Sequence, residues 1–187
     1  MSEPEPGSRT AGGAVDLADP VRDDDHALGP GTAAATLLEY GDYECPDCMA
    51  SFPVVNRLRA ELGEAMRFVF RHFPQTSVHP RASVAAQAAE AAGAQGRFWP
   101  MHDLLYESRG GLDPSDLDRM ALRLNLEVYR FQADLTAGRF VAKVARDATG
   151  GRRSGVTGTP TFFVNGRRVP GRDYDALMAA IEQVQRR

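Results

Sequence analysis

Two cysteines, Cys45 and Cys48, are the residues of this sequence best suited to chemistry, and the chain has no others. Two residues separate them, in the order Cys45-Pro46-Asp47-Cys48. Thiols this close together can form and break a disulfide within one turn of a helix. The attacking species in such an exchange is a thiolate, and the reaction passes through a mixed disulfide. The spacing therefore predicts a redox-active thiol pair.

A zinc site and a structural disulfide are the alternative interpretations of the same pair. A tetrahedral zinc site needs two further ligands. The chain has no second cysteine pair, and His72 and His79 are spaced more widely than the usual His-x(3–5)-His pattern. A structural disulfide across one helical turn would close a very short loop and add little stability. We therefore expect no metal and no organic cofactor beyond the Cys45–Cys48 disulfide itself.

The elements around the pair place Cys45 where a strand turns into a helix. Residues 36–40 are apolar except for one carboxylate and predict a short buried strand, while apolar residues at helical spacing predict a helix over 46–62. Pro46 suits the first helical position, where its missing N–H is not needed. Unpaired N–H groups and the helix dipole at that end favour a thiolate on Cys45. Cys48, one turn further along, is placed to resolve a mixed disulfide.

The rest of the chain alternates between strand and helix patterns. Residues 66–73 predict a strand, and about 80–151 predict four or five successive helices. Asn165-Gly166 lies between two strand-like runs and predicts a hairpin, which an amphipathic helix from Tyr174 follows. Without the helical stretch, a small sheet flanked by helices remains, which indicates an α/β fold.

Length and composition predict one soluble domain. The 187 residues are 43% hydrophobic and 25% charged, and the net charge of -3 gives no electrostatic case for nucleic acid. We expect a flexible tail over 1–30 and a single domain over 31–187. No secretory signal or membrane-spanning segment is visible in the sequence. The prediction is a cytoplasmic protein that binds neither membrane nor nucleic acid.

In this order, the motifs resemble the DsbA-like branch of the thioredoxin superfamily, over about residues 26 to 185. The resemblance implies a thioredoxin fold with a helical insertion at about 77–151. In that family a loop presents a cis-proline to the active site, and Gly158-Thr159-Pro160 is similar to this loop. By resemblance, Thr159 and Pro160 are expected to bind substrate, together with Pro46 and Asp47.

Two more positions match the family. Glu39 lies six residues before Cys45, where thioredoxin-like enzymes keep a buried acid. Pro53 lies eight residues after Cys45, where these enzymes often have a proline that kinks the active-site helix. A carboxyl group in an apolar strand should have a raised pKa and can accept a proton from Cys48. The alternative is that Glu39 is a carboxylate at a strand edge, facing solvent.

The two residues between the cysteines depart from the family pattern. Pro46-Asp47 replaces the Pro-His of strongly oxidising members and the Gly-Pro of reducing members, so the direction of electron flow stays open. We expect the Asp47 carboxylate to oppose a thiolate on Cys45 and to favour a mildly reducing or exchange role.

The sequence thus predicts a thiol–disulfide oxidoreductase with Cys45, Cys48 and Glu39 as catalytic residues. Its expected partners are protein or peptide thiols and disulfides, together with an unidentified electron-transfer partner. The alternative is a non-catalytic thioredoxin-like module that binds extended segments or senses redox state.

Overall fold

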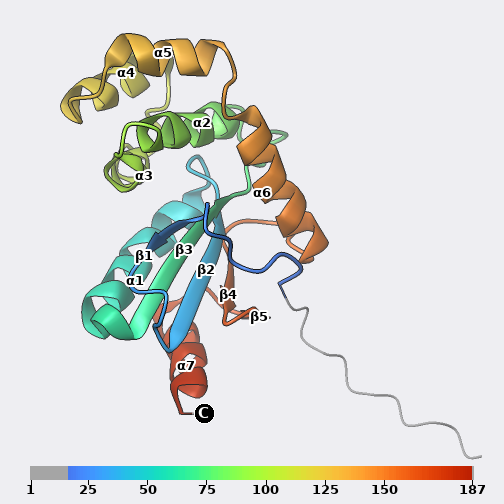
Figure 1. Cartoon of the computed structure of the whole chain (residues 1–187). Coiled ribbons are helices and arrows are strands. Elements are labelled where there is room, and N and C mark those ends of the chain that lie inside the picture. Colours follow the sequence, from blue (N-terminus) through green and yellow to red (C-terminus); the bar gives the residue numbers. More distant parts are fainter. Residues whose placement is uncertain (1–16, 187) are drawn as a thin grey trace, which may run out of the picture.

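A computed structural model describes residues 17–186 of the chain, which form an α/β fold around a five-stranded sheet (Figure 1). The central strand β2 (Ala35–Gly41) pairs in parallel with β3 (Met66–His72) and antiparallel with β4 (Thr161–Val164). At the edges, β1 (His26–Leu28) pairs antiparallel with β3, and β5 (Arg167–Arg168) pairs antiparallel with β4. The strand order is β1-β3-β2-β4-β5.

Side chains that alternate along β2 fill two separate cores. Leu37 lies on one face, in the core that α1 (Pro46–Leu62) and α7 (Tyr174–Gln185) cover. Leu38 and Tyr40 lie on the other face, against Ala148 of α6 (Val141–Arg153). Both faces of β2 are therefore buried, as expected for the centre of a sheet that helices flank.

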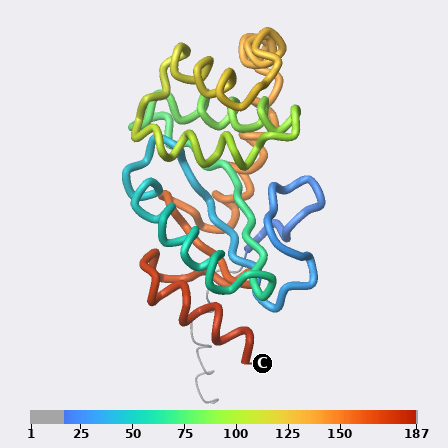
Figure 2. Tube along the Cα trace, turned by 90° about the vertical axis from the view of Figure 1, so that its left-hand side faces the viewer, coloured from blue at the N-terminus to red at the C-terminus, as the bar shows by residue number. Residues whose placement is uncertain are grey.

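A block of helices covers one end of the sheet, as Figures 1 and 2 show from two directions. It consists of α2 (Ala82–Gly93), α3 (Phe98–Glu107), α4 (Pro114–Arg123) and α5 (Val128–Thr136), and α6 runs from it back along the sheet. The expected insertion at about 77–151 is therefore close to the observed α2–α6. Among residues 17–186, no helix is long and apolar enough to cross a lipid bilayer.

The residues that begin and end the helices, and those of the hairpin turn, lie where the sequence predicted them. Pro46 is the first residue of α1, Gly63 caps its end with a φ of 50°, and Asp113 begins α4 through a capping box with Asp116. Asn165 and Gly166 have φ values of 46° and 80°, as the predicted hairpin turn requires.

The prediction of a flexible tail over 1–30 is wrong for its second part. Residues 1–16 lie outside the described residues, but residues 17–30 pack against the sheet. Leu17 and Val21 contact the second core, and β1 forms the edge strand beside β3. The physical reason is the buried Asp25 carboxylate, which pairs with the guanidinium of Arg71 on β3 and fastens this segment.

Candidate active site

The two cysteines lie at the start of α1, as predicted. Cys45 is the N-cap residue, with extended backbone angles (φ -76°, ψ 121°), and Pro46 is the first residue inside the helix. Both cysteines are free thiols in this structure. Cys45 is 5% exposed and Cys48 is fully buried, so Cys45 is the more accessible of the two.

The two sulfurs have opposite electrostatic environments. A hydrogen bond from the Cys48 thiol lowers the pKa of Cys45 to about 5, and the backbone N–H groups of Cys48 and Asp47 add to this effect. Burial raises the pKa of Cys48 well above its ordinary value, and the hydrogen bond to Cys45 and the Glu39 charge raise it further. At neutral pH Cys45 is a thiolate and Cys48 a thiol, which are the states that a nucleophile and a resolving thiol need.

The loop before β4 lies against the Cys45 sulfur. Cys45 Sγ is 3.3 Å from the carbonyl oxygen of Thr159, and the Thr159–Pro160 peptide bond is cis. Gln75 Nε2 donates to the Thr159 hydroxyl at 3.2 Å, which fixes the loop from the other side. A hollow of about 260 Å³ begins at Pro160 and is lined by Thr161, Phe162, Arg168, Val169, Pro170, Gly171 and Arg172.

Glu39 is 2% exposed, so the alternative of a carboxylate facing solvent is wrong. In the sheet it stands between Phe70 of β3 and Phe162 of β4, and its Oε1 atom has no hydrogen-bond partner among the described residues. Burial raises its pKa to about 8, and the nearby Cys45 charge contributes to this rise. Its role in proton transfer stays a prediction.

Asp47 has a cationic partner that the sequence did not place beside it. Its carboxylate accepts a hydrogen bond from Arg172 Nη1 at 2.8 Å, while its backbone N–H lowers the Cys45 pKa. The pair is solvent-exposed, with the two side chains 54% and 51% accessible, so the effect of Asp47 on the Cys45 thiolate stays a prediction. Arg71 does not take this part, because it is fully buried and bound to Asp25.

Two polar residues beside the cysteines, Asp42 and His79, were not predicted as part of the site. Asp42 is buried in the turn before Cys45, and its carboxylate accepts hydrogen bonds from the backbone N–H groups of Glu44 and Gln75, both at 2.9 Å. It also lies 2.8 Å from Nδ1 of His79. The sequence signals were an acid three residues before Cys45 and a His-Pro pair at a helix start. Neither signal shows that these residues meet.

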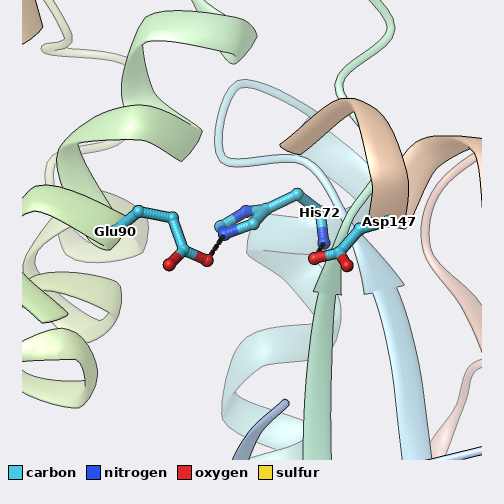
Figure 3. Close-up of side chains that lie close together, drawn as sticks. All are labelled: His72, Glu90 and Asp147. Atoms are coloured by element: carbon cyan, nitrogen blue, oxygen red, sulfur yellow. Dashed lines mark hydrogen bonds and ion pairs between the residues drawn. The ribbon is translucent and has the colours of Figure 1, made fainter. Parts of the chain in front are cut away.

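A second cluster of titratable side chains joins the sheet to the helical block (Figure 3). His72 of β3 lies 2.9 Å from the Glu90 carboxylate of α2, and Asp147 of α6 is within hydrogen-bond distance of the His72 backbone N–H. Lys143 Nζ is 2.6 Å from Asp147 and 3.7 Å from Glu90. Asp147 also pairs with Arg22, and Glu90 also pairs with His26. Because these partners already occupy the two carboxylates, the cluster does not fit a metal ion and is a buried network of ion pairs between the sheet and the helical block.

The fold and the site together define a class of protein, the thioredoxin-fold proteins with a cysteine pair at a helix start. A family model described as thioredoxin matches residues 22–183. The chain therefore belongs to the thioredoxin family.

Solved structures narrow the likeness to the DsbA-like branch. BdbD from Bacillus subtilis, in its oxidised form, has a TM-score of 0.80 at 24% identity, over 94% of this chain and 100% of that one. A thioredoxin-like oxidoreductase from Silicibacter pomeroyi has a TM-score of 0.79 at 27% identity, over 89% and 95%. DsbA2 from Pseudomonas aeruginosa has a TM-score of 0.70 at 25% identity, over 88% and 97%. The DsbA-like resemblance and fold are confirmed.

Curated relatives are longer proteins. The chain is 50% identical over 171 residues to Na(+)/H(+) antiporter NhaA 1 of Salinispora arenicola, covering 90% of this chain and 26% of that protein. It is 40% identical over 183 residues to Na(+)/H(+) antiporter NhaA of Herminiimonas arsenicoxydans, covering 97% and 29%. The chain thus spans between a quarter and a third of the length of these two relatives.

Proposed function

We propose that this chain is a thiol–disulfide oxidoreductase that exchanges disulfides with protein or peptide thiols through Cys45 and Cys48. The observation that carries the proposal is the contrast between the two sulfurs at the start of α1. Cys45 has a pKa of about 5 and can be reached, while Cys48 is buried with a raised pKa. No reaction that uses only one cysteine requires such a contrast.

In the proposed reaction, the Cys45 thiolate attacks one sulfur of a substrate disulfide, and the other substrate sulfur leaves as a thiolate. Cys48 then loses its proton and attacks Cys45, which releases the second substrate thiol and leaves the Cys45–Cys48 disulfide. The reverse sequence oxidises a substrate dithiol. Thr159, Pro160 and the hollow beside them are proposed to hold an extended substrate segment.

The acidity of Cys45 revises the expected direction of electron flow. A pKa of about 5 lies between about 7 for thioredoxin and about 3.5 for DsbA. A more acidic thiolate stabilises the reduced form, which makes the disulfide more oxidising. We therefore propose a reduction potential for the Cys45–Cys48 disulfide between those of thioredoxin (about -270 mV) and DsbA (about -120 mV). This is more oxidising than Asp47 alone suggested. A cytoplasmic location stays a prediction from the sequence.

Insulin reduction tests the proposal. With dithiothreitol as the reductant, the protein is expected to catalyse many turnovers of insulin disulfides, followed by the turbidity of the released B chain. The alternative, a binding or redox-sensing module, would bind an extended peptide without turnover. Failure to exceed the rate with dithiothreitol alone, under conditions where thioredoxin does so, would contradict an enzymatic function.

A kinetic and a thermodynamic effect are expected when Glu39 is replaced by glutamine. If Glu39 accepts the Cys48 proton, Glu39→Gln slows the resolving step by about 10²-fold, the lower end of general acid–base catalysis, and leaves the first attack unchanged. Stopped-flow measurement of mixed-disulfide formation and decay separates the two steps. Equal loss in both steps, or loss in neither, would leave Glu39 with a structural role only.

The same variant changes how stability depends on pH. The folded pKa of about 8 lies above the ordinary value of 4.5, so the stability that the bound proton contributes is present below about pH 4.5 and is lost as the pH rises through 8. Reduced Glu39→Gln is therefore expected to be more stable than the parent by about 2–4 kcal/mol at pH 8 and nearly equal to it at pH 5. Urea unfolding at both pH values measures the difference.

A further inference from the structure

His79 lies beside the active site, in the turn that leads into α2. Its ring nitrogen Nδ1 is 2.8 Å from Asp42 Oδ2, and its side chain is 16% exposed. The Asp42 carboxylate is itself fixed, because it accepts hydrogen bonds from the backbone N–H groups of Glu44 and Gln75. The imidazole is therefore held in place and is not a mobile surface side chain.

The groups that face this imidazole are acidic. Burial lowers the pKa of His79, but the hydrogen bond to Asp42 and the charges of Asp42, Cys45 and Glu44 outweigh this effect, so the pKa is raised. The nearest basic side chain on the same turn, Arg81, pairs with Asp113 at the start of α4. Among these neighbours, Cys45 is the one whose charge changes when the disulfide forms.

We propose that protonated His79, held by Asp42, is a positioning residue that stabilises the Cys45 thiolate and so sets the redox poise of the Cys45–Cys48 pair. This inference rests on the proposed function and deepens it. The dipeptide between the cysteines supplies no cation, because Asp47 is an anion paired with Arg172. Protonated His79 instead offsets the negative charge of the buried Asp42 carboxylate in the turn before Cys45, a charge that opposes a thiolate there.

The redox step shows why the charge matters. When a substrate dithiol reduces the protein, the Cys45–Cys48 bond breaks and the two substrate sulfurs form a disulfide, which transfers two electrons. Cys48 takes up a proton, and Cys45 is left as a thiolate. His79 faces this negative charge only in the reduced protein, so it must bind its proton more tightly there. By reciprocity, the protonated imidazole favours the reduced protein and makes the disulfide a stronger oxidant.

The unmodified protein provides the first test. The chain has four histidines, so their ring signals can be resolved and titrated by NMR in the oxidised and the reduced protein. One histidine, identified by the loss of its signal in His79→Asn, is expected to have a higher pKa in the reduced form. The same His79 pKa in both forms would overturn the inference.

Variants give the second test. His79→Asn keeps a hydrogen-bond donor for Asp42 but removes the cation, so the Cys45 pKa is expected to rise by about one unit, measured as thiolate absorbance at 240 nm in the reduced protein. The equilibrium with glutathione should then shift about tenfold toward the disulfide, equivalent to about 30 mV. His79→Lys, which keeps a positive charge, should recover most of both effects.

Arg81→Gln is the matched control, because it removes a cation from the same turn that faces Asp113 instead of Cys45. It is expected to leave the Cys45 pKa unchanged. An unchanged Cys45 pKa in folded His79→Asn, or equal shifts in His79→Asn and Arg81→Gln, would overturn the role of His79. Insulin turnover by the parent protein would still support the proposed function in that case, so the two failures can be distinguished.

Discussion

Replacing Cys45 by serine is expected to reduce insulin turnover to the rate with dithiothreitol alone. Cys45 carries the thiolate that substrate can reach, and the buried Cys48 thiol, with its raised pKa, cannot replace it. A serine hydroxyl at this position cannot form a disulfide, so neither direction of exchange remains. The measurement is the initial rate of insulin reduction, with circular dichroism to show that the variant is folded.

Cys48→Ser is the matched partner of this experiment. It keeps the Cys45 nucleophile, so it should attack substrate disulfides but accumulate the mixed disulfide, which mass spectrometry detects as a covalent adduct. Because the Cys48 thiol also lowers the Cys45 pKa, that pKa should rise in this variant. Retained turnover in Cys45→Ser, or adducts on Cys45→Ser in place of Cys48→Ser, would show that the roles of the two sulfurs are reversed.

Arg71→Met is expected to destabilise the protein by about 3–5 kcal/mol, as when one partner of a buried ion pair is removed. The Arg71 guanidinium is fully buried and binds both oxygens of Asp25, at 3.0 and 2.7 Å. It also donates to the Tyr40 hydroxyl and to the backbone carbonyls of Asp19 and Pro20. Its loss leaves a buried carboxylate without its main partner and frees the segment before β1. Urea unfolding at neutral pH measures the change.

Two further variants make this measurement specific. Asp25→Asn combined with Arg71→Met removes both charges and should recover part of the lost stability, because the buried carboxylate is gone. Arg186→Met breaks the exposed pair with Glu182 and should change stability by less than about 0.5 kcal/mol. A loss from Arg71→Met as small as that of Arg186→Met would mean that Arg71 does not fasten the segment.

The sequence predicted the parts of the fold that have a local signal. The strand before Cys45, the start of α1 at Pro46 and the Asn165-Gly166 turn each depend on neighbouring residues, and each was predicted close to its observed place. Strand β1 was missed because its three residues have no alternating pattern. What holds this part of the chain is the Asp25–Arg71 pair, whose members lie 46 residues apart in the sequence.

The same distinction applies to the site. Cys45 and Cys48 were predicted from their spacing and Glu39 from the family resemblance, and the burial expected of Glu39 is observed. The pairing of Asp42 with His79 could not be predicted, because 37 residues separate the two and neither belongs to a recognisable motif. For the same reason, the sequence could not place Arg172 beside Asp47, and the influence of Asp47 on Cys45 stays a prediction.

The position of β4 in the sheet has a consequence for the order in which the site is assembled. β4 follows β2 in the sequence by more than 100 residues, yet it pairs with β2 beside Glu39, and the loop before it brings Thr159 to the Cys45 sulfur. Until residues 159–164 dock, Glu39 lacks the neighbour that helps to bury it, and Cys45 lacks its cover. We therefore expect a nascent chain that ends before Thr159 to carry two ordinary thiols and an ordinary carboxylate. The chemistry of the pair would begin only when β4 joins the sheet.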